Sequence, residues 1–391
     1  MRPMTAAPPY AHLTPHGMLD AVAAAGFPVT GGLLQLNSYE NRVVQLALED
    51  GAGVVAKFYR PARWSDAQIL EEHAFALELA AADLPVVAPL PLRPSREEPL
   101  LRVSDDPRTL GQWTIAGDGE RDGDRDGDGD GDGDGDGGDD GVTRAAPDAG
   151  GKRATAASAY RFAVSPRRAG RSPELESPHT LAWLGRLLGR LHAVGAERPF
   201  AHRRTLDVDT FGWQARQRVQ DGDALGPCAE AATWLDASAR ALDAVARAFE
   251  QAGAVRRIRL HGDCHPGNIL WREEGEGAGP LFVDLDDACM GPAVQDLWML
   301  LSGDREAMQG QLHHVLEGYR VFRPFDRAEL ALVEPLRTLR MVHHSAWLAE
   351  RWSDPAFPAA FPWFGTPGYW GQQVTQLREQ LEAMAEGPLV A

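Results

Sequence analysis

Polar side chains that could bind a metal ion and accept a proton are concentrated between residues 260 and 287. Asp263 lies in the run His-Gly-Asp-Cys-His-Pro-Gly-Asn, which ends at Asn268, and Asp284 follows 16 positions later in the run Phe-Val-Asp-Leu-Asp-Asp. One carboxylate can accept the proton of an attacking hydroxyl, while an amide oxygen and a second carboxylate hold Mg2+. Phosphoryl transfer needs these groups in this order. The segment therefore predicts a phosphotransferase that uses ATP and magnesium.

Other residues of the same segment allow alternative interpretations. A polar turn could carry acidic residues without a role, but the run is longer and more specific than an isolated Asp and Asn. His261 and His265 lack the spacing of a zinc site, and we expect His261 to pack beneath the loop. Asp286 and Asp287 could hold metal, attract a basic acceptor or form a solvated acidic loop. Cys264 is expected to be a buried, inert thiol, since no cation is placed to lower its pKa.

Short strands must position these groups. We expect strands over residues 256–260 and 280–284, on either side of a loop that glycine and proline make tight. Asp263 and Asn268 then lie on one side of that loop. Asp284, at the end of the second strand, faces them.

The rest of the chain divides into a mostly β N-terminal part and a mostly helical C-terminal part. Ser65 is a candidate N-cap for a helix that continues to about residue 82, and another helix is expected over about 180–194. Strands are expected over residues 32–36, 41–48, 54–59 and 159–164. This arrangement predicts an α+β protein.

Charge is distributed unevenly along the chain. The formal net charge is -17, and residues 118–141 hold twelve acidic residues and two arginines, a local net charge of -10 that leaves -7 for the rest. An acidic balance argues against a nucleic-acid partner. There is no apolar run of membrane-spanning length, no secretory h-region and no Cys-x-x-Cys pair, so we expect a cytoplasmic protein without a disulfide scaffold.

Two segments lack the composition of a folded element. Residues 1–11 are expected to form a flexible tail, and residues 117–157, rich in Asp and Gly, a disordered insert. A calcium loop is the alternative for the insert, but it has neither the flanking helices nor the final Glu of an EF-hand. We expect an N-terminal lobe over residues 12–166 and a C-terminal lobe over 167–391.

The catalytic run, H-G-D-x-H-x-x-N followed by D-x-D, resembles the aminoglycoside phosphotransferase and choline kinase-like branch of the protein-kinase superfamily. Longer runs resemble the bacterial stress response kinase A family, from about residue 12 to about 373. They are Leu-Asn-Ser-Tyr-Glu-Asn-Arg-Val at 36–43, Lys-Phe-Tyr-Arg-Pro at 57–61, Ile-Leu-Glu-Glu-His at 69–73, the acidic run at 282–287 and Gly-Pro-Ala-Val-Gln-Asp-Leu-Trp-Met-Leu-Leu at 291–301. The resemblance implies a two-lobed protein-kinase-like fold, with an antiparallel sheet and one helix in the small lobe.

The resemblance also implies roles for individual residues. Asp263 would accept the proton, and Asn268 and Asp284 would bind Mg2+, with Asp284 matching the Asp of the kinase D-F-G motif. No A-P-E motif follows, so switching by phosphorylation is not expected. The ATP-binding residues lie nearer the N-terminus.

Lys57, on the third strand, would grip the α- and β-phosphates of ATP. It would pair with a glutamate of the following helix, either Glu71 or Glu72, of which Glu72 is favoured. Ser38 and nearby backbone N–H groups would cover the phosphates where other kinases place a glycine-rich loop.

Three functions are compatible with these residues. The resemblance favours a Ser/Thr protein kinase of the bacterial stress response, which we expect to be a monomer. The alternative is a kinase of a small alcohol (aminoglycoside, choline or homoserine-like), and a non-catalytic scaffold is a third. An aromatic cluster could either pack or line the acceptor pocket. Its members are Trp347, Trp352, Phe357, Phe361, Trp363, Phe364, Tyr369 and Trp370.

Overall fold

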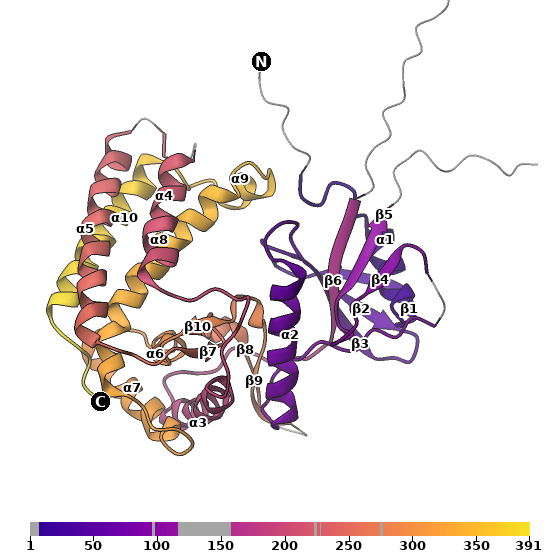
Figure 1. Cartoon of the computed structure of the whole chain (residues 1–391), viewed down its shortest axis with the longest axis horizontal. Helices are drawn as coiled ribbons and strands as arrows, with labels where there is room; N and C mark the ends of the chain where they lie inside the picture. Colours follow the sequence, from indigo (N-terminus) through magenta and orange to yellow (C-terminus); the bar gives the residue numbers. More distant parts are fainter. Residues whose placement is uncertain (1–7, 96–97, 116–157, 223–224, 227, 274–276) are drawn as a thin grey trace, which may run out of the picture.

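The computed structural model describes residues 8–95, 98–115, 158–222, 225–226, 228–273 and 277–391. These form a sheet-containing lobe and a larger helical lobe, with helix α2 between them (Figure 1). The two lobes have separate clusters of buried apolar side chains. None of the helices in the described ranges combines the length and the apolar character that crossing a membrane requires.

The smaller lobe is built on one antiparallel sheet of six strands, in the order β1-β2-β3-β6-β5-β4. Its elements are α1 (Pro15–Ala24), β1 (Val29–Gln35), β2 (Arg42–Leu48), β3 (Gly53–Phe58), α2 (Asp66–Ala81), β4 (Leu101–Val103), β5 (Gly111–Ile115) and β6 (Ser158–Pro166). Alternate residues of the central strands point into the core; in β3, for example, Val54, Ala56 and Phe58 are buried. This alternation is the period of two that the sequence shows.

Helix α2 begins where the sequence predicted. The Ser65 side chain accepts a hydrogen bond from the backbone of Gln68, whose own side chain returns a bond to Ser65, which completes a capping box. One face of the helix buries Ile69, Phe75 and Leu79. The helix is thereby fixed between the sheet and the helical lobe.

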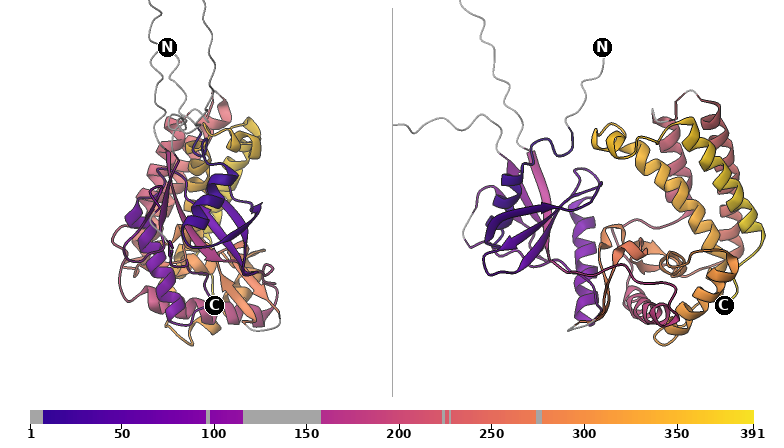
Figure 2. Two further views of the ribbon diagram at one scale, coloured as in Figure 1. Left: turned by 90° about the vertical axis from the view of Figure 1, so that its right-hand side faces the viewer. Right: turned by 180° about the vertical axis from the view of Figure 1, so that it is seen from behind.

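The larger lobe is mostly helical, and Figure 2 shows its long helices gathered on the side away from the sheet. Its helices are α3 (Pro178–Gly195), α4 (Gln214–Asp221), α5 (Ala229–Ala252), α6 (Val294–Trp298), α7 (Arg305–Tyr319), α8 (Val333–Glu350), α9 (Ala356–Ala360) and α10 (Pro367–Ala385). Two small antiparallel ladders lie beside them: β7 (Ile258–Leu260) pairs with β10 (Cys289–Gly291), and β8 (Ile269–Arg272) pairs with β9 (Gly279–Phe282). The mixed α+β, two-lobed architecture is the predicted one.

The N-terminal tail was predicted wrongly at its end. Tyr10 is buried, and its hydroxyl donates towards the backbone oxygens of Glu40 and Phe58, each at 3.2 Å. An aromatic ring among many prolines and alanines is enough to fix this segment against the sheet. The first seven residues and the predicted insert over 117–157 lie outside the described residues.

Strands β5 and β6 flank that insert. They are antiparallel neighbours in the sheet, and Ile115 is the register partner of Ser158. The chain therefore leaves the sheet and returns to it at adjacent positions.

Candidate active site

The predicted catalytic loop connects β7 to β8 through a 3₁₀ turn at Pro266–Asn268. Asn268 donates from Nδ2 to the backbone oxygen of Asp263 at 2.9 Å and lies 3.4 Å from its Oδ2. Gly262 has φ 86°, and a Cβ there would lie 2.2 Å from the backbone oxygen of Asp287. The loop can follow this path only with glycine at that position.

Buried groups fix the loop from below. Asp296, with no exposed surface, accepts hydrogen bonds from the backbone N–H of His261 (2.8 Å) and of Gly262 (2.9 Å). Its carboxyl group also contacts Nε2 of His192 at 3.0 Å. His261 is buried, with Nε2 3.0 Å from the backbone oxygen of Val283, so it packs beneath the loop as predicted.

Asp284 lies just after β9 rather than within it, because the strand ends at Phe282. Its backbone is left-handed, with φ 61° and ψ 64°. A non-glycine residue in this conformation is uncommon and costs about 1–3 kcal/mol, so the surrounding structure must hold it there. Val283 donates from its backbone to the oxygen of Asn268 at 3.0 Å, which ties this turn to the catalytic loop.

Lys57, on β3, reaches across the lobes to Asp284, with Nζ 2.6 Å from Oδ1. Although burial opposes its charged form, Asp284, Asp286 and Glu72 raise the pKa of Lys57 above its ordinary value. Glu72 is buried, and its burial raises the pKa of this carboxyl to about 7 despite the positive charge of Lys57. Glu71 instead accepts backbone hydrogen bonds from residues 201–203. Glu72 is therefore the glutamate placed on the Lys57 side of α2.

Asp286 and Asp287 are anchored by arginines. Asp286 is buried and accepts a hydrogen bond from Asn41 (3.2 Å) and a close one from Arg63. Asp287 accepts from Arg63 at 2.7 Å and from Arg204 at 3.3 Å. A solvated acidic loop is therefore the wrong interpretation for Asp286, since this carboxylate is buried and forms an ion pair with Arg63.

The two carboxylate oxygens of Asp263 differ in their contacts. Oδ1 forms a close ion pair with Arg340 of α8, while Oδ2 has only longer contacts, including one of 3.5 Å to Nε2 of His265. Burial favours the neutral acid, but His265 and Arg340 hold the pKa of Asp263 well below its usual range. Asp263 is therefore ionised at neutral pH, and Oδ2 is the oxygen available to a further donor.

A cavity of about 820 Å3 opens beside these groups. Its lining includes Ser38 from the loop between β1 and β2, Asp263 and Asp284 from the catalytic segment, and Arg340 from α8. The Oγ of Ser38 accepts a hydrogen bond from the backbone N–H of Asn41 at 3.3 Å, which shapes this loop. Ser38 of one lobe thus meets Asp263 and Asp284 of the other around one cavity, whereas Lys57, Glu72 and Asn268 are not among the residues that line it.

The predicted aromatic cluster serves two purposes. Trp347 and Phe361 line the cavity, and the ring of Phe361 lies 4.7 Å from that of Tyr39 in the other lobe. The remaining members pack on one another, and Trp370 and Phe357 are almost wholly buried. Packing and cavity lining are both present, in different members of the cluster.

Asn268 and Asp284 have the donor atoms that suit Mg2+. The nitrogen of the Asn268 amide is engaged by Asp263, which leaves Oδ1 as an acceptor. The Asp284 side chain is 51% exposed, so its second oxygen is accessible. Two protein oxygens are a sufficient set, because Mg2+ completes its octahedron with water and substrate phosphates.

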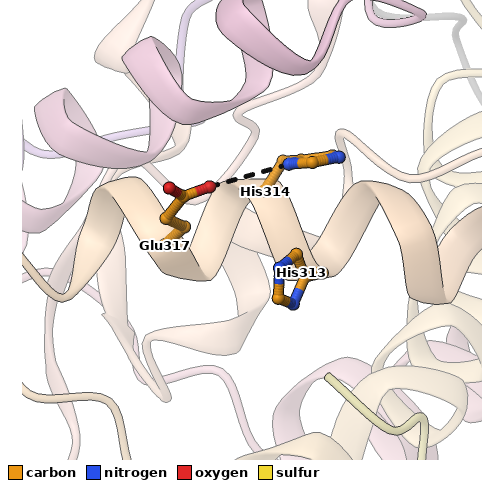
Figure 3. A group of neighbouring side chains, drawn as sticks. All are labelled: His313, His314 and Glu317. Carbon is orange, nitrogen blue, oxygen red and sulfur yellow. Dashed lines mark ion pairs between the residues drawn. The ribbon is translucent and has the colours of Figure 1, made fainter.

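A second group with metal-binding side chains lies on α7, where His313, His314 and Glu317 are close together (Figure 3). Nδ1 of His314 lies 3.7 Å from Glu317. In Figure 3 the ring of His313 points away from that contact. Since His313 and Glu317 are exposed and none of the three lines the cavity, we assign this group no part in the site.

Sequence reasoning missed three contributors to the site: Arg340, Arg63 and Asp296. Asp296 lies within a run that carried the family resemblance, so a signal for it existed. Arg340 lies 77 positions from Asp263 on an ordinary amphipathic helix, and no local pattern links the two. Cys264, by contrast, is buried as expected, and burial raises the pKa of its thiol well above the ordinary value.

Comparison with known sequences gives a consistent result. A model of the phosphotransferase enzyme family matches residues 32–125 and 141–333. The stress response kinase A of Salmonella choleraesuis is 40% identical over 377 residues, which cover 96% of this chain and 95% of that protein. A Salmonella typhimurium protein named serine/threonine protein kinase RdoA matches with the same identity and coverage. The stress response kinase A of Escherichia coli K12 is 38% identical over the same length.

Solved structures support the fold. Amicoumacin kinase hAmiN, in complex with AMP-PNP, Ca2+ and Ami, has a TM-score of 0.60 at 16% identity and covers 96% of this chain and 94% of its own. A microcompartment-associated aminopropanol kinase has a TM-score of 0.61 at 18% identity, with coverage of 94% and 97%. At these identities the similarity concerns the architecture alone.

Proposed function

The chain belongs to the phosphotransferase enzyme family and to the stress response kinase A family, and from that premise we propose that it is a Ser/Thr protein kinase of the bacterial stress response. It is an ATP-dependent phosphotransferase, as its family requires. The protein acceptor is inferred from the name of the Salmonella typhimurium relative, whose match covers 96% of the chain. A monomeric state and a cytoplasmic location stay predictions.

One observation supports this chemistry above the others. Asp263, which is ionised, and Asp284 line a single cavity, and each contacts one further predicted residue: Asn268 donates to Asp263, and Lys57 pairs with Asp284. The acceptor hydroxyl would donate its hydrogen bond to Oδ2 of Asp263, which aims the hydroxyl oxygen at the γ-phosphorus of ATP. As the new P–O bond forms, the bond from the γ-phosphorus to the bridging oxygen breaks. The proton passes to Oδ2 and ADP leaves.

The remaining residues would hold the nucleotide. Lys57 would exchange part of its contact with Asp284 for the α- and β-phosphates, and Glu72 would steady it from α2. Ser38 and the backbone of its loop would cover the phosphates. Mg2+, held by Asn268 and Asp284, would neutralise charge that develops on the phosphate oxygens.

A small alcohol is the second candidate acceptor, because the cavity of about 820 Å3 is within the range of small-molecule sites. The catalytic groups do not separate the two acceptors, since both offer a hydroxyl. The acceptor must therefore be identified by experiment.

The test is incubation of the purified protein with γ-labelled ATP, Mg2+ and a basic protein, beside Asp263→Asn. We expect label on Ser or Thr of the protein and a fall of about 1000-fold or more in the variant, since the base that orients the hydroxyl is lost. Label on an aminoglycoside, choline or homoserine instead of protein would favour the small-molecule acceptor. Undiminished transfer by Asp263→Asn would contradict the assigned chemistry.

A further inference from the structure

Arg340 lies where the reaction would take place. It projects from the middle of α8, on the helical wall of the cavity, and its guanidinium contacts Oδ1 of Asp263. Within the described residues this is the one hydrogen bond its side chain makes, and the side chain is 45% exposed. Most of its five N–H donors therefore have no partner among the described residues of the protein.

The other arginines of the cavity wall are committed to other carboxylates. Arg63 pairs with both Asp286 and Asp287, and its side chain is 10% exposed. Arg351 pairs with Glu40 at 2.7 Å and is 11% exposed. Among the cations of the described cavity wall, Arg340 is the most exposed, and it alone contacts the proton acceptor.

The position of the transferred group follows from Asp263. The acceptor hydroxyl must lie about 2.6–3.2 Å from Oδ2, and the γ-phosphorus must lie in line beyond the hydroxyl oxygen. A guanidinium bound to the other oxygen of the same carboxylate is then a few ångströms from the equatorial oxygens of that phosphoryl group. Its remaining donors would then be within reach of those oxygens as they gather charge.

We propose that Arg340 is a further catalytic residue, which donates hydrogen bonds to the γ-phosphoryl group during its transfer while it keeps Oδ1 of Asp263 in place. The proposal rests on the phosphotransferase chemistry proposed above but not on the class of acceptor. Arg340 gains and loses no proton in the step. The bond made, the bond broken and the proton passed to Asp263 are those of the transfer itself.

Two other roles would place an arginine at this point. It could only brace Asp263, or it could block the acceptor site until displaced. A brace acts only through Asp263, so adding Arg340→Ala to Asp263→Asn should lower kcat no further, whereas the loss of a donor to the phosphoryl group should still lower it in that background. A block should raise activity when removed. A donor to the moving phosphoryl group should lower kcat and leave ATP binding nearly unchanged.

The experiment measures ADP release by full-length protein with saturating Mg-ATP, with and without a basic protein acceptor. Arg340→Ala is expected to lower kcat about 100-fold, as the loss of one transition-state donor does elsewhere, with KM for ATP changed less than about threefold. Added guanidinium ion, below the concentration that unfolds the protein, should restore part of kcat. Arg340→Lys, which keeps the charge but not the planar fork, should lose about 10-fold.

Arg378→Ala, on the exposed face of α10, is the matched control and should behave as the wild type. An Arg340→Ala kcat that is unchanged or raised would overturn the proposal. The proposal would also be overturned if added guanidinium did not restore the kcat of Arg340→Ala and Arg340→Lys were as slow as Arg340→Ala. If the wild type releases ADP but labels no protein, the protein-kinase proposal fails. The proposal for Arg340 can still be tested in that case, because it compares the rates of ADP release by the wild type and the Arg340 variants.

Discussion

The two sides of the active site are built differently. The loop that carries Asp263 is held inside one lobe by fully buried groups, above all by Asp296 and its contact with His192. The nucleotide side depends on Lys57 and Asp284, which come from different lobes and are 23% and 51% exposed. The proposed proton acceptor is thus positioned by folding of the helical lobe. The position of Lys57 and Asp284, the pair that we propose lies at the phosphates, depends on how the two lobes meet.

This difference predicts that damage to the buried side should affect both stability and activity. Asp296→Asn leaves one of two backbone N–H groups facing an amide nitrogen and weakens a buried pair. We expect about 3 kcal/mol less free energy of unfolding in urea, and about 100-fold lower kcat. Asp304→Asn, which changes an exposed helix cap, is the control and should cost about 1 kcal/mol or less. Full activity in Asp296→Asn would show that the loop does not need this support.

The exposed side should lose activity without losing stability. Lys57→Met removes the ammonium that would bind the phosphates, so we expect KM for ATP to rise and kcat to fall about 100-fold together. The partly exposed pair with Asp284 contributes less than about 1 kcal/mol, so the midpoint of unfolding should hardly move. Arg167→Met is the control, because Arg167 directly follows β6, contacts Gln45 of β2 and does not line the cavity. A large loss of stability in Lys57→Met would contradict the contrast between the two sides.

Glu72 should make the nucleotide side sensitive to pH. Burial raises the pKa of Glu72 from 4.5 to about 7, so between these values the folded protein holds a proton that the unfolded chain releases. The contribution of the protonated Glu72 carboxyl to the free energy of unfolding is fully present below about pH 4.5 and is lost as the pH rises through about 7. Urea unfolding from pH 5 to 8 should show the wild type losing about 2–3 kcal/mol relative to Glu72→Gln. Parallel curves for the two proteins would mean that Glu72 titrates normally.

The site could be predicted from sequence where its parts are close along the chain. Asp263, Asn268 and Asp284 lie within 22 positions of one another, and their spacing alone indicated the chemistry. Ser65 marked the start of α2, because capping is a local interaction. Roles in catalysis remain predictions for Asp263, Asn268 and Asp284, while the structure shows that Asp263 and Asp284 line one cavity and that Asn268 contacts Asp263.

The choice between Glu71 and Glu72 could have been made from helical periodicity. Glu72 is three residues after Ile69 and three before Phe75, both buried, so it shares their face of α2. Glu71 also neighbours Phe75, four residues later, but it is only two residues after Ile69, and it accepts hydrogen bonds from the backbone of the helical lobe. Neighbouring positions on a helix point in different directions, and that rule separates the two candidates.

Long-range partners could not be predicted in this way. Arg340 meets Asp263 across 77 positions and His192 meets Asp296 across 104, because α8 and α3 each fold back to the catalytic loop. The residue types are ordinary for amphipathic helices, and only the packing of the lobe brings the pairs together. Tyr10 was missed for the same reason, since its partners are distant strands and loops.

The pairing of Ile115 with Ser158 has a consequence for the length of the chain between them. Where both ends of a connection are fixed side by side, the entropy of closing it grows only with the logarithm of its length, about 0.6 kcal/mol for each doubling. The free energy of folding of this lobe is therefore almost independent of how many residues join β5 to β6. This connection can gain or lose residues over evolution while the strand that carries Lys57 keeps its place.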